Sequence, residues 1–172
     1  GLMDLRLGAI DPGVRCRTCG GRLKECLGHP GAIDLARPVL HVKYVPLVEM
    51  VLRCFCSECG KILLSDENIA KYKIAQRIKK SKDVKKCPYC NASQEKVKLD
   101  KPTTFYIGKK RLFPVEIREK LVKISNDQLK LIGVNPESAR PEWAVLTLLI
   151  VPPVTVRPSI TLESGERSED DL

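Results

Sequence analysis

The sequence contains two sets of four potential metal ligands, and each set consists of two pairs whose members are separated by two residues. The sets are Cys16, Cys19, Cys26 and His29, and Cys56, Cys59, Cys87 and Cys90. Two sulfurs at this spacing converge on one metal ion when the backbone turns tightly, and two such pairs complete a tetrahedron. Because four protein ligands leave no position for water or substrate, the sequence predicts two structural zinc ions and no catalytic one.

The residues that follow three of the cysteine pairs support this interpretation. Gly20 follows Cys19, Gly60 follows Cys59, and Asn91 follows the last pair. Glycine and asparagine are the residues that best accept the left-handed backbone conformation needed to leave such a turn. Aromatic residues make up only 5% of the 172 residues, so metal binding would supply folding free energy that a thin core lacks.

Eight cysteines could also form disulfides in a secreted chain. The paired spacing and the absence of a signal peptide at the start of the sequence favour zinc in a reducing cytoplasm. Cys54 is left over and is expected to be a free thiol, although it could compete with Cys56 as a ligand. His41 is a further candidate ligand, but a lone histidine on a strand is more often a packed or surface residue.

The remaining pattern predicts an α+β fold with short helices and small antiparallel strands. The expected strands and extended segments cover 33–45, 95–107 and 143–151, the last of them apolar enough to be buried on both faces. A helix is expected to begin at Pro46, another to cover 66–78, and a third to begin at Pro114. Ser125 or Asn126 can cap a short helix that Gly133 ends.

The formal net charge of +9 favours a polyanionic partner such as nucleic acid. Much of this charge lies between Lys71 and Lys86, a stretch that contains eight basic residues and a single acidic one, Asp83. This run is either a solvated helix face or a contact for phosphates. The candidate nucleic-acid-binding residues are Lys79, Lys80, Lys82, Lys109, Lys110, Arg111, Arg157 and Arg167, with 109–111 expected in a loop. No apolar run approaches the length of a membrane span.

Several stretches together resemble the amino-terminal clamp region of the largest subunit of multisubunit DNA-directed RNA polymerases, in its archaeal form. They are GLMDLRLGAIDPGVRCRTCGG, HPGAIDLARPVLHV, CSECG, CPYC, RPEWAVLTLLIVPP and VRPSITLESGERSEDDL. The resemblance implies that the two ligand sets are the clamp zinc sites. It also implies that the acidic end, from about Arg157 to Leu172, begins the lid, a loop that helps to part the transcript from the template.

The family's catalytic aspartate motif, NADFDGD, does not occur in this sequence. The resemblance therefore implies a part of a nucleotidyltransferase that carries no catalytic residue, with Mg²⁺ bound elsewhere in the complete enzyme. The implied partners are the second-largest subunit, the remainder of the largest subunit, DNA, the RNA–DNA hybrid, and initiation and elongation factors. The implied location is the cytoplasm of an archaeal cell.

The expected organisation has four segments. Residues 1–60 hold the first zinc site and half of the second, 61–100 form a basic helical insert that completes the second site, 101–156 form the clamp core, and 157–172 start the lid. The alternative is a free-standing zinc-ribbon adaptor that binds protein or nucleic acid. A redox or hydrolytic enzyme is disfavoured because the sequence lacks both a βαβ unit around a cysteine pair and a deaminase HxE motif.

Overall fold

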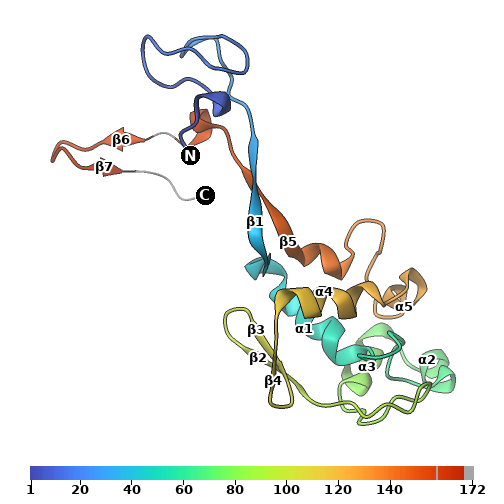
Figure 1. Cartoon of the computed structure of the whole chain (residues 1–172). Coiled ribbons are helices and arrows are strands. Elements are labelled where there is room, and N and C mark those ends of the chain that lie inside the picture. Colours follow the sequence, from blue (N-terminus) through green and yellow to red (C-terminus); the bar gives the residue numbers. More distant parts are fainter. Residues whose placement is uncertain (158, 169–172) are drawn as a thin grey trace. The chain divides into compact units, whose positions relative to one another are not determined.

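The computed structural model describes residues 1–157 and 159–168, without the side chains of Thr161 and Arg167. The chain divides into two compact units (Figure 1). Unit 1 comprises residues 1–36 and 148–172, and unit 2 comprises residues 37–147. The predicted α+β class with short helices and small antiparallel sheets is confirmed. The four expected segments remain a prediction, and the two compact units have different bounds.

Unit 2 contains the α-helices and the largest hydrophobic core of the described chain. Its helices are α1 (Val45–Cys54), α2 (Asp66–Lys71), α3 (Ile74–Ser81), α4 (Pro114–Val122) and α5 (Asn126–Lys130). Val48 and Val51 of α1 pack into one buried cluster with Ile117 and Leu121 of α4, and the two helices lie next to each other in Figure 1. Valine, isoleucine and leucine therefore form most of this core, as the low aromatic content requires.

The helix boundaries confirm most of the sequence expectations. Pro114 begins α4, and Pro46 lies in the first turn of α1, where its missing N–H leaves no bond unmade. Ser125 caps α5, because its Oγ accepts a hydrogen bond from the Gln128 N–H at 3.4 Å. Gly133 follows with a φ of 81°, which a residue with a side chain rarely adopts. No helix among the described residues is long and apolar enough to cross a membrane.

The prediction of a single helix over 66–78 is wrong, because the helix is interrupted at Tyr72, between α2 and α3. In a continuous helix the Ile69 carbonyl oxygen would accept from the Lys73 N–H. Here that oxygen accepts instead from the Arg77 guanidinium, at 3.0 Å from Nε and 2.7 Å from Nη2. The Lys73 N–H donates to Gln76 Oε1 at 3.3 Å and starts the next helix. The side chain of Arg77, eight residues further along, therefore takes the place of the helical bond at this oxygen.

A three-stranded antiparallel sheet precedes α4. Its strands are β2 (Val97–Asp100), β3 (Thr104–Ile107) and β4 (Lys110–Leu112), with β3 in the centre. Phe105 is fully buried and faces Leu99 on one side and Leu112 on the other. The extended segment expected over 95–107 is confirmed only in part, because a turn at 101–103 divides it into the antiparallel strands β2 and β3. The loop expected at 109–111 is wrong for Lys110 and Arg111, which pair with Ile107 and Tyr106.

Strand β1 (Gly31–Leu40) pairs with β5 (Val145–Val151) in a two-stranded sheet. The expected strand over 33–45 ends early, because His41 starts the 3₁₀ helix η2 (Val42–Tyr44), with its Nδ1 accepting from the Lys43 N–H. The strand expected over 143–151 begins only after the 3₁₀ helix η3 (Pro141–Ala144). It is not buried on both faces within this chain, since Leu148 and Ile150 are 45% and 71% exposed.

Unit 1 consists largely of loops and short elements. They are the 3₁₀ helices η1 (Leu5–Leu7) and η4 (Val154–Val156) and the antiparallel hairpin of β6 (Ile160–Thr161) and β7 (Arg167–Ser168). Arg157 is buried, and its guanidinium donates to the carbonyl oxygens of Pro152, at 2.9 Å, and Leu2. This side chain therefore joins the beginning of the chain to the segment after β5. Pro158 and residues 169–172 of the expected lid lie outside the described residues.

Candidate metal centres

Three of the four cysteine pairs, those that begin at Cys16, Cys56 and Cys87, adopt one repeated backbone turn. In each turn the first cysteine's N–H donates to the carbonyl oxygen five residues later, and its own carbonyl accepts from the N–H four residues later, at 2.9–3.1 Å. Gly20, Gly60 and Asn91 occupy the predicted positive-φ positions at 74°, 69° and 59°. The glycine and asparagine prediction is therefore confirmed at all three turns.

Gly60 is required for a second reason. A Cβ atom at this position would lie 2.6 Å from the Lys123 carbonyl oxygen. A carbon that close to backbone oxygen forces one of the two segments to move. The turn therefore packs directly against the end of α4.

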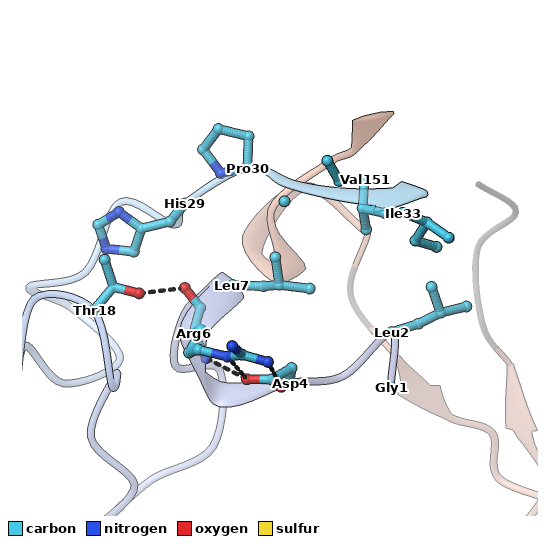
Figure 2. Close-up of a pocket in the computed structure, with 12 residues that line it drawn as sticks. Gly1, Leu2, Asp4, Arg6, Leu7, Thr18, His29, Pro30, Ile33 and Val151 are labelled. Carbon is cyan, nitrogen blue, oxygen red and sulfur yellow. Dashed lines mark hydrogen bonds and ion pairs between the residues drawn. The ribbon is translucent and has the colours of Figure 1, made fainter. Parts of the chain in front are cut away.

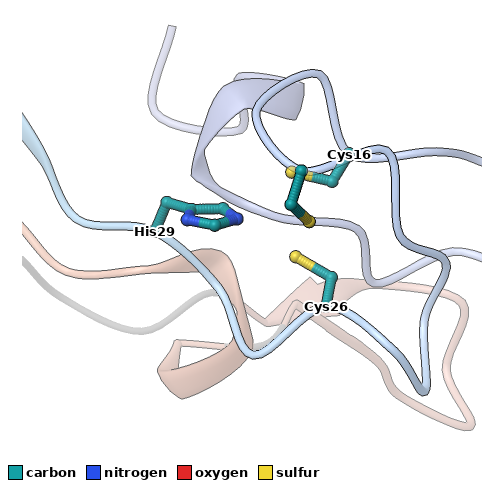
Figure 3. A group of neighbouring side chains, drawn as sticks. Cys16, Cys26 and His29 are labelled. Carbon is teal, nitrogen blue, oxygen red and sulfur yellow. The ribbon is translucent and has the colours of Figure 1, made fainter.

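The first set gathers its four side chains in unit 1. One ligand atom from each of Cys16, Cys19, Cys26 and His29 lies within 4.8 Å of the others. The edge of the imidazole ring is turned towards the sulfurs (Figure 3). The Nε2 atom of His29 is buried without a hydrogen-bond partner in the described structure. A buried nitrogen without a partner is costly unless it binds something, and a metal ion would satisfy it.

Backbone contacts with η1 hold this first set in place. The His29 N–H donates to the Leu7 carbonyl oxygen and the Arg17 N–H to that of Leu5, both at 3.0 Å. The Thr18 hydroxyl donates to the Arg6 carbonyl oxygen at 2.7 Å (Figure 2). A pocket of about 660 Å³ lies beside His29, and Arg6 in its lining forms an ion pair with Asp4 at 2.8 Å. Figure 2 shows its lining residues. The segment before the first cysteine is therefore part of the site.

The second set has sulfur separations that match a tetrahedral centre. The Cys56 and Cys90 sulfurs lie 3.6 Å apart, and those of Cys59 and Cys87 lie 3.7 Å apart. Four sulfurs at about 2.3 Å from a shared ion in tetrahedral geometry lie about 3.8 Å from one another. A disulfide requires about 2.05 Å, and all eight cysteines are free. The disulfide alternative is therefore wrong for this structure.

Residues outside the ligand pairs complete the second site. Gln94 Nε2 donates to the Cys56 sulfur at 3.3 Å, while its Oε1 accepts from the Ser57 N–H. The Tyr89 hydroxyl donates to the Leu64 carbonyl oxygen at 2.9 Å and also contacts Asp66 Oδ1 at 2.8 Å. Hydrogen bonds of this kind orient metal ligands. No spacing motif in the sequence identifies Gln94 or Tyr89, although both lie within four residues of a ligand.

The backbone turns also favour thiolates at the first cysteine of a pair. Burial raises the pKa of Cys16, but hydrogen bonds from the N–H groups of Cys19 and Thr18 outweigh it and lower that pKa to about 6. The same balance, with the N–H groups of Cys59 and Glu58, lowers the pKa of Cys56 to about 7. Burial, and after it the neighbouring sulfurs, raise the pKa of Cys59 to about 12. A cation would counteract this increase because it stabilises every thiolate in the set.

Cys54 and His41 lie apart from both sets. Cys54 is fully buried, and its sulfur contacts the Ile78 carbonyl oxygen at 3.7 Å. Burial raises the pKa of its thiol, which keeps it protonated. His41 accepts a backbone hydrogen bond and packs against Tyr44, with ring centres 4.9 Å apart. Among the described residues, neither side chain joins a four-ligand group.

The candidate nucleic-acid-binding residues have different surroundings. Lys79, Lys80, Lys82, Lys109 and Arg111 are exposed. Lys110 forms an ion pair with Glu116 at 2.6 Å. Arg157 is 7% exposed and bonded to backbone, so it is not a surface cation. The side chain of Arg167 lies outside the described residues. Within the basic run, Arg77 bonds to backbone carbonyls, which leaves the lysines as its exposed charges.

The fold and these sites define a small α+β chain with two groups of four cysteine or histidine side chains, each of which could hold a metal ion. A family model described as RNA polymerase Rpb1, domain 1, matches residues 1–172. The chain therefore belongs to this family, as its resemblance predicts.

Similar proteins include subunits named DNA-directed RNA polymerase subunit Rpo1N. The one from Methanothermobacter thermautotrophicus strain Delta H is 51% identical over 187 residues, that from Thermococcus celer 48% over 197 residues, and that from Sulfolobus acidocaldarius 42% over 193 residues. Each alignment covers 100% of this chain and 22% of the relative. The chain thus spans about a fifth of the length of these relatives.

Proposed function

We propose that this chain is a clamp portion of the largest subunit of an archaeal DNA-directed RNA polymerase. It would hold two structural zinc ions and close over DNA and the RNA–DNA hybrid. The observation that carries the proposal is the family match over the whole chain, combined with two closed four-ligand sites in it. The proposed setting is the reducing cytoplasm, and the proposed activity is that of the complete nucleotidyltransferase.

The donor atoms support zinc as the ion. Thiolates with one imidazole, in tetrahedral sets, are the ligands of structural zinc, whereas magnesium and calcium take oxygen ligands. Cys16, Cys19, Cys26 and His29 would hold one ion, and Cys56, Cys59, Cys87 and Cys90 the other. Each ion would link chain segments and leave no open coordination position for chemistry. In the proposed complete enzyme, Mg²⁺ would be bound by residues outside these 172.

The packing of unit 1 explains why a metal would be needed there. Around the first set, the cluster of buried apolar residues consists of Ala9 and two of the ligands, Cys16 and Cys26. Such a cluster buries too little apolar surface to order three loops. In unit 2 the second set lies beside a core that includes α1 and α4. Metal binding would therefore contribute a larger share of folding free energy in unit 1.

Rigidity links the metal sites to the proposed role. A clamp moves as a body about a hinge, so its parts must keep their shape while it swings. The exposed lysines of α3 and the following turn, Lys79, Lys80 and Lys82, would retain DNA through phosphates without reading its sequence. Other polymerase subunits and transcription factors are proposed partners because they would act on the same assembled subunit.

The test is reconstitution of an archaeal polymerase whose largest subunit carries Cys16→Ser and Cys19→Ser together. We expect the altered enzyme to lose one zinc ion and to dissociate from DNA sooner, giving shorter transcripts. Cys54→Ser in the same subunit is the matched control, and it should retain both ions and normal transcript lengths. Full-length transcripts from an enzyme lacking the first ion would contradict the clamp role. Two zinc ions in a chain that never joins the polymerase would favour the adaptor alternative.

A further inference from the structure

The outer face of the β2–β3–β4 sheet combines aromatic rings with cations. The antiparallel register places Lys98, Tyr106 and Arg111 opposite one another in a single row across the three strands. Side chains two residues apart in a strand point to the same side. Phe113 directly follows β4 and keeps an extended backbone, with φ −85° and ψ 155°, so the same alternation places it beside Arg111. The Arg111 guanidinium carbon lies 5.4 Å from the centre of the Phe113 ring.

The opposite face of the same sheet belongs to the core. Leu99, Phe105 and Leu112 form the neighbouring row, and Phe105 and Leu112 are 0% and 4% exposed. Phe113, by contrast, is 55% exposed. Burial therefore accounts for the rings and aliphatic groups on the inner face. It does not account for Phe113 on the outer one, and it accounts only in part for Tyr106, which is half-buried.

The two faces also differ in whether their cations form ion pairs. Lys110 lies on the inner side and is neutralised by Glu116 at 2.6 Å. Within the described part of the chain, Lys98 and Arg111 form no ion pair, so their charges remain available. Lys96 and Lys109 are exposed at the end of the sheet next to this row. Two acidic residues flank β2: Asp100 at its far end, and Glu95, whose carboxylate lies next to Gly108 at the same end as Lys96 and Lys109.

We propose that this outer face binds single-stranded nucleic acid. Aromatic rings on an exposed sheet stack on bases whose faces are free, while neighbouring cations contact the backbone phosphates. A duplex hides its base faces, so it would use the cations alone. An acidic protein segment would likewise leave the two rings without a function. The inference goes beyond clamp closure, which requires only phosphate contacts, and it rests on residues of this sheet and on Phe113, which follows it.

The experiment measures fluorescence anisotropy of labelled oligo(dT), oligo(rU), an abasic strand of equal length and a duplex. The protein is the full 172-residue chain, purified with zinc. We expect oligo(dT) or oligo(rU) to bind roughly tenfold more tightly than the abasic strand, since stacking on a ring strengthens binding by that order. The tighter of the two identifies DNA or RNA as the preferred strand.

The variants separate stacking from charge. Tyr106→Val keeps strand propensity and removes the ring. It should therefore weaken the binding of oligo(dT) roughly tenfold and leave the binding of the abasic strand unaffected. Phe113→Ala provides the same test at the second ring if Tyr106→Val fails to fold. Arg111→Gln should weaken the binding of both strands and reduce by about 0.7 the slope of log affinity against log salt concentration. Arg118→Gln, which removes an exposed charge on α4 outside the sheet, is the matched control and should change neither.

Equal affinities for the abasic strand and oligo(dT) would overturn the proposal. So would an unchanged affinity in both ring variants, a control variant as weak as Arg111→Gln, or tighter binding of a polyglutamate peptide, which would indicate an acidic protein partner. None of these readouts requires polymerase assembly. Failure here and failure of the clamp role are therefore distinguishable.

Discussion

The sulfur atoms of Cys56 and Cys90 lie 3.6 Å apart, although 34 positions separate the two residues. Their contact closes a loop of the chain that contains α2, α3 and the whole basic run from Lys71 to Lys86. The neighbouring Cys54 sulfur contacts the Ile78 carbonyl oxygen instead. Cys56 and Cys90 therefore close this loop, whereas Cys54 packs against it. These two roles can be tested separately.

Replacing Cys87 by Ser should reduce the zinc content from two ions to one, because hydroxyl oxygen is a poor zinc ligand. Cys54→Ser should leave two ions, since Cys54 lies outside both sets. Native mass spectrometry of each variant counts the ions. Loss of an ion from Cys54→Ser, or two ions in Cys87→Ser, would contradict the ligand assignment.

Chelation of zinc should expose unit 1 before the core of unit 2. The N–H groups of Cys16 and Gly20 are bonded within a turn that only a small apolar cluster supports. Those of α1 and α4 lie in the largest core. Hydrogen exchange after chelation should therefore rise by orders of magnitude in 16–29 and little in α1. Uniform exchange throughout the chain would mean that the metal stabilises both units equally.

The break between α2 and α3 should depend on Arg77. Arg77→Met removes three hydrogen bonds to the carbonyls of Ile69 and Leu131 and should lower the free energy of unfolding by roughly 2 kcal/mol. Lys80→Met, on an exposed position of the same helix, is the control and should change it by less than about 0.5 kcal/mol. Chemical denaturation compares the two. Equal effects would show that these bonds contribute nothing beyond ordinary side-chain replacement.

The stability contributed by Glu116 should depend on pH. Hydrogen bonds, first from Lys110 and then from the Phe113 N–H, lower the pKa of its carboxyl below the ordinary value of 4.5. A carboxyl with a lowered folded-state pKa adds stability above its unfolded pKa, and this is lost as the pH falls through the folded value. Glu116→Gln should therefore lower the melting temperature at pH 7 and lose that effect in strong acid.

Glu119→Gln, an exposed position on the same helix, is the control for that measurement. It should have little effect at either pH. A penalty for Glu116→Gln that persists unchanged in strong acid would show that the amide disturbs packing and that the charge is irrelevant.

Charge reversal of Lys79, Lys80 and Lys82 to Glu should weaken retention of DNA by the assembled polymerase and make it less dependent on salt. Each lost phosphate contact lowers the slope of log affinity against log salt concentration by about 0.9 for a duplex. The measurement is dissociation of DNA at several salt concentrations. The control reverses the exposed residues Lys123 and Lys130, which lie outside the loop between Cys56 and Cys90. It is compared with reversal of Lys79 and Lys80 alone, so that both variants change the net charge equally. If both sets of variants behave alike, the run is a solvated surface.

The local features of the metal sites could be predicted from the sequence because they depend on neighbours in the chain. Cysteine spacing, Gly20, Gly60 and Asn91 together specify the turns, and Pro114 and Ser125 specify where helices begin. The family could also be identified from short stretches such as CSECG and RPEWAVLTLLIVPP. Each of these features arises from residues within a few positions of one another.

The tertiary structure decided the features that depend on distant partners. Nothing in the sequence near Tyr72 predicts an interrupted helix, whereas in the structure Arg77 donates to the carbonyl oxygens of Ile69 and of Leu131, 54 positions away. From the sequence Arg157 is expected to be an exposed cation, but it is buried and donates a hydrogen bond to the Leu2 carbonyl oxygen. The face that joins Tyr106 to Arg111 exists only through strand register. Hydrogen bonds and packing between remote segments override local propensity, since only the folded chain brings their atoms together.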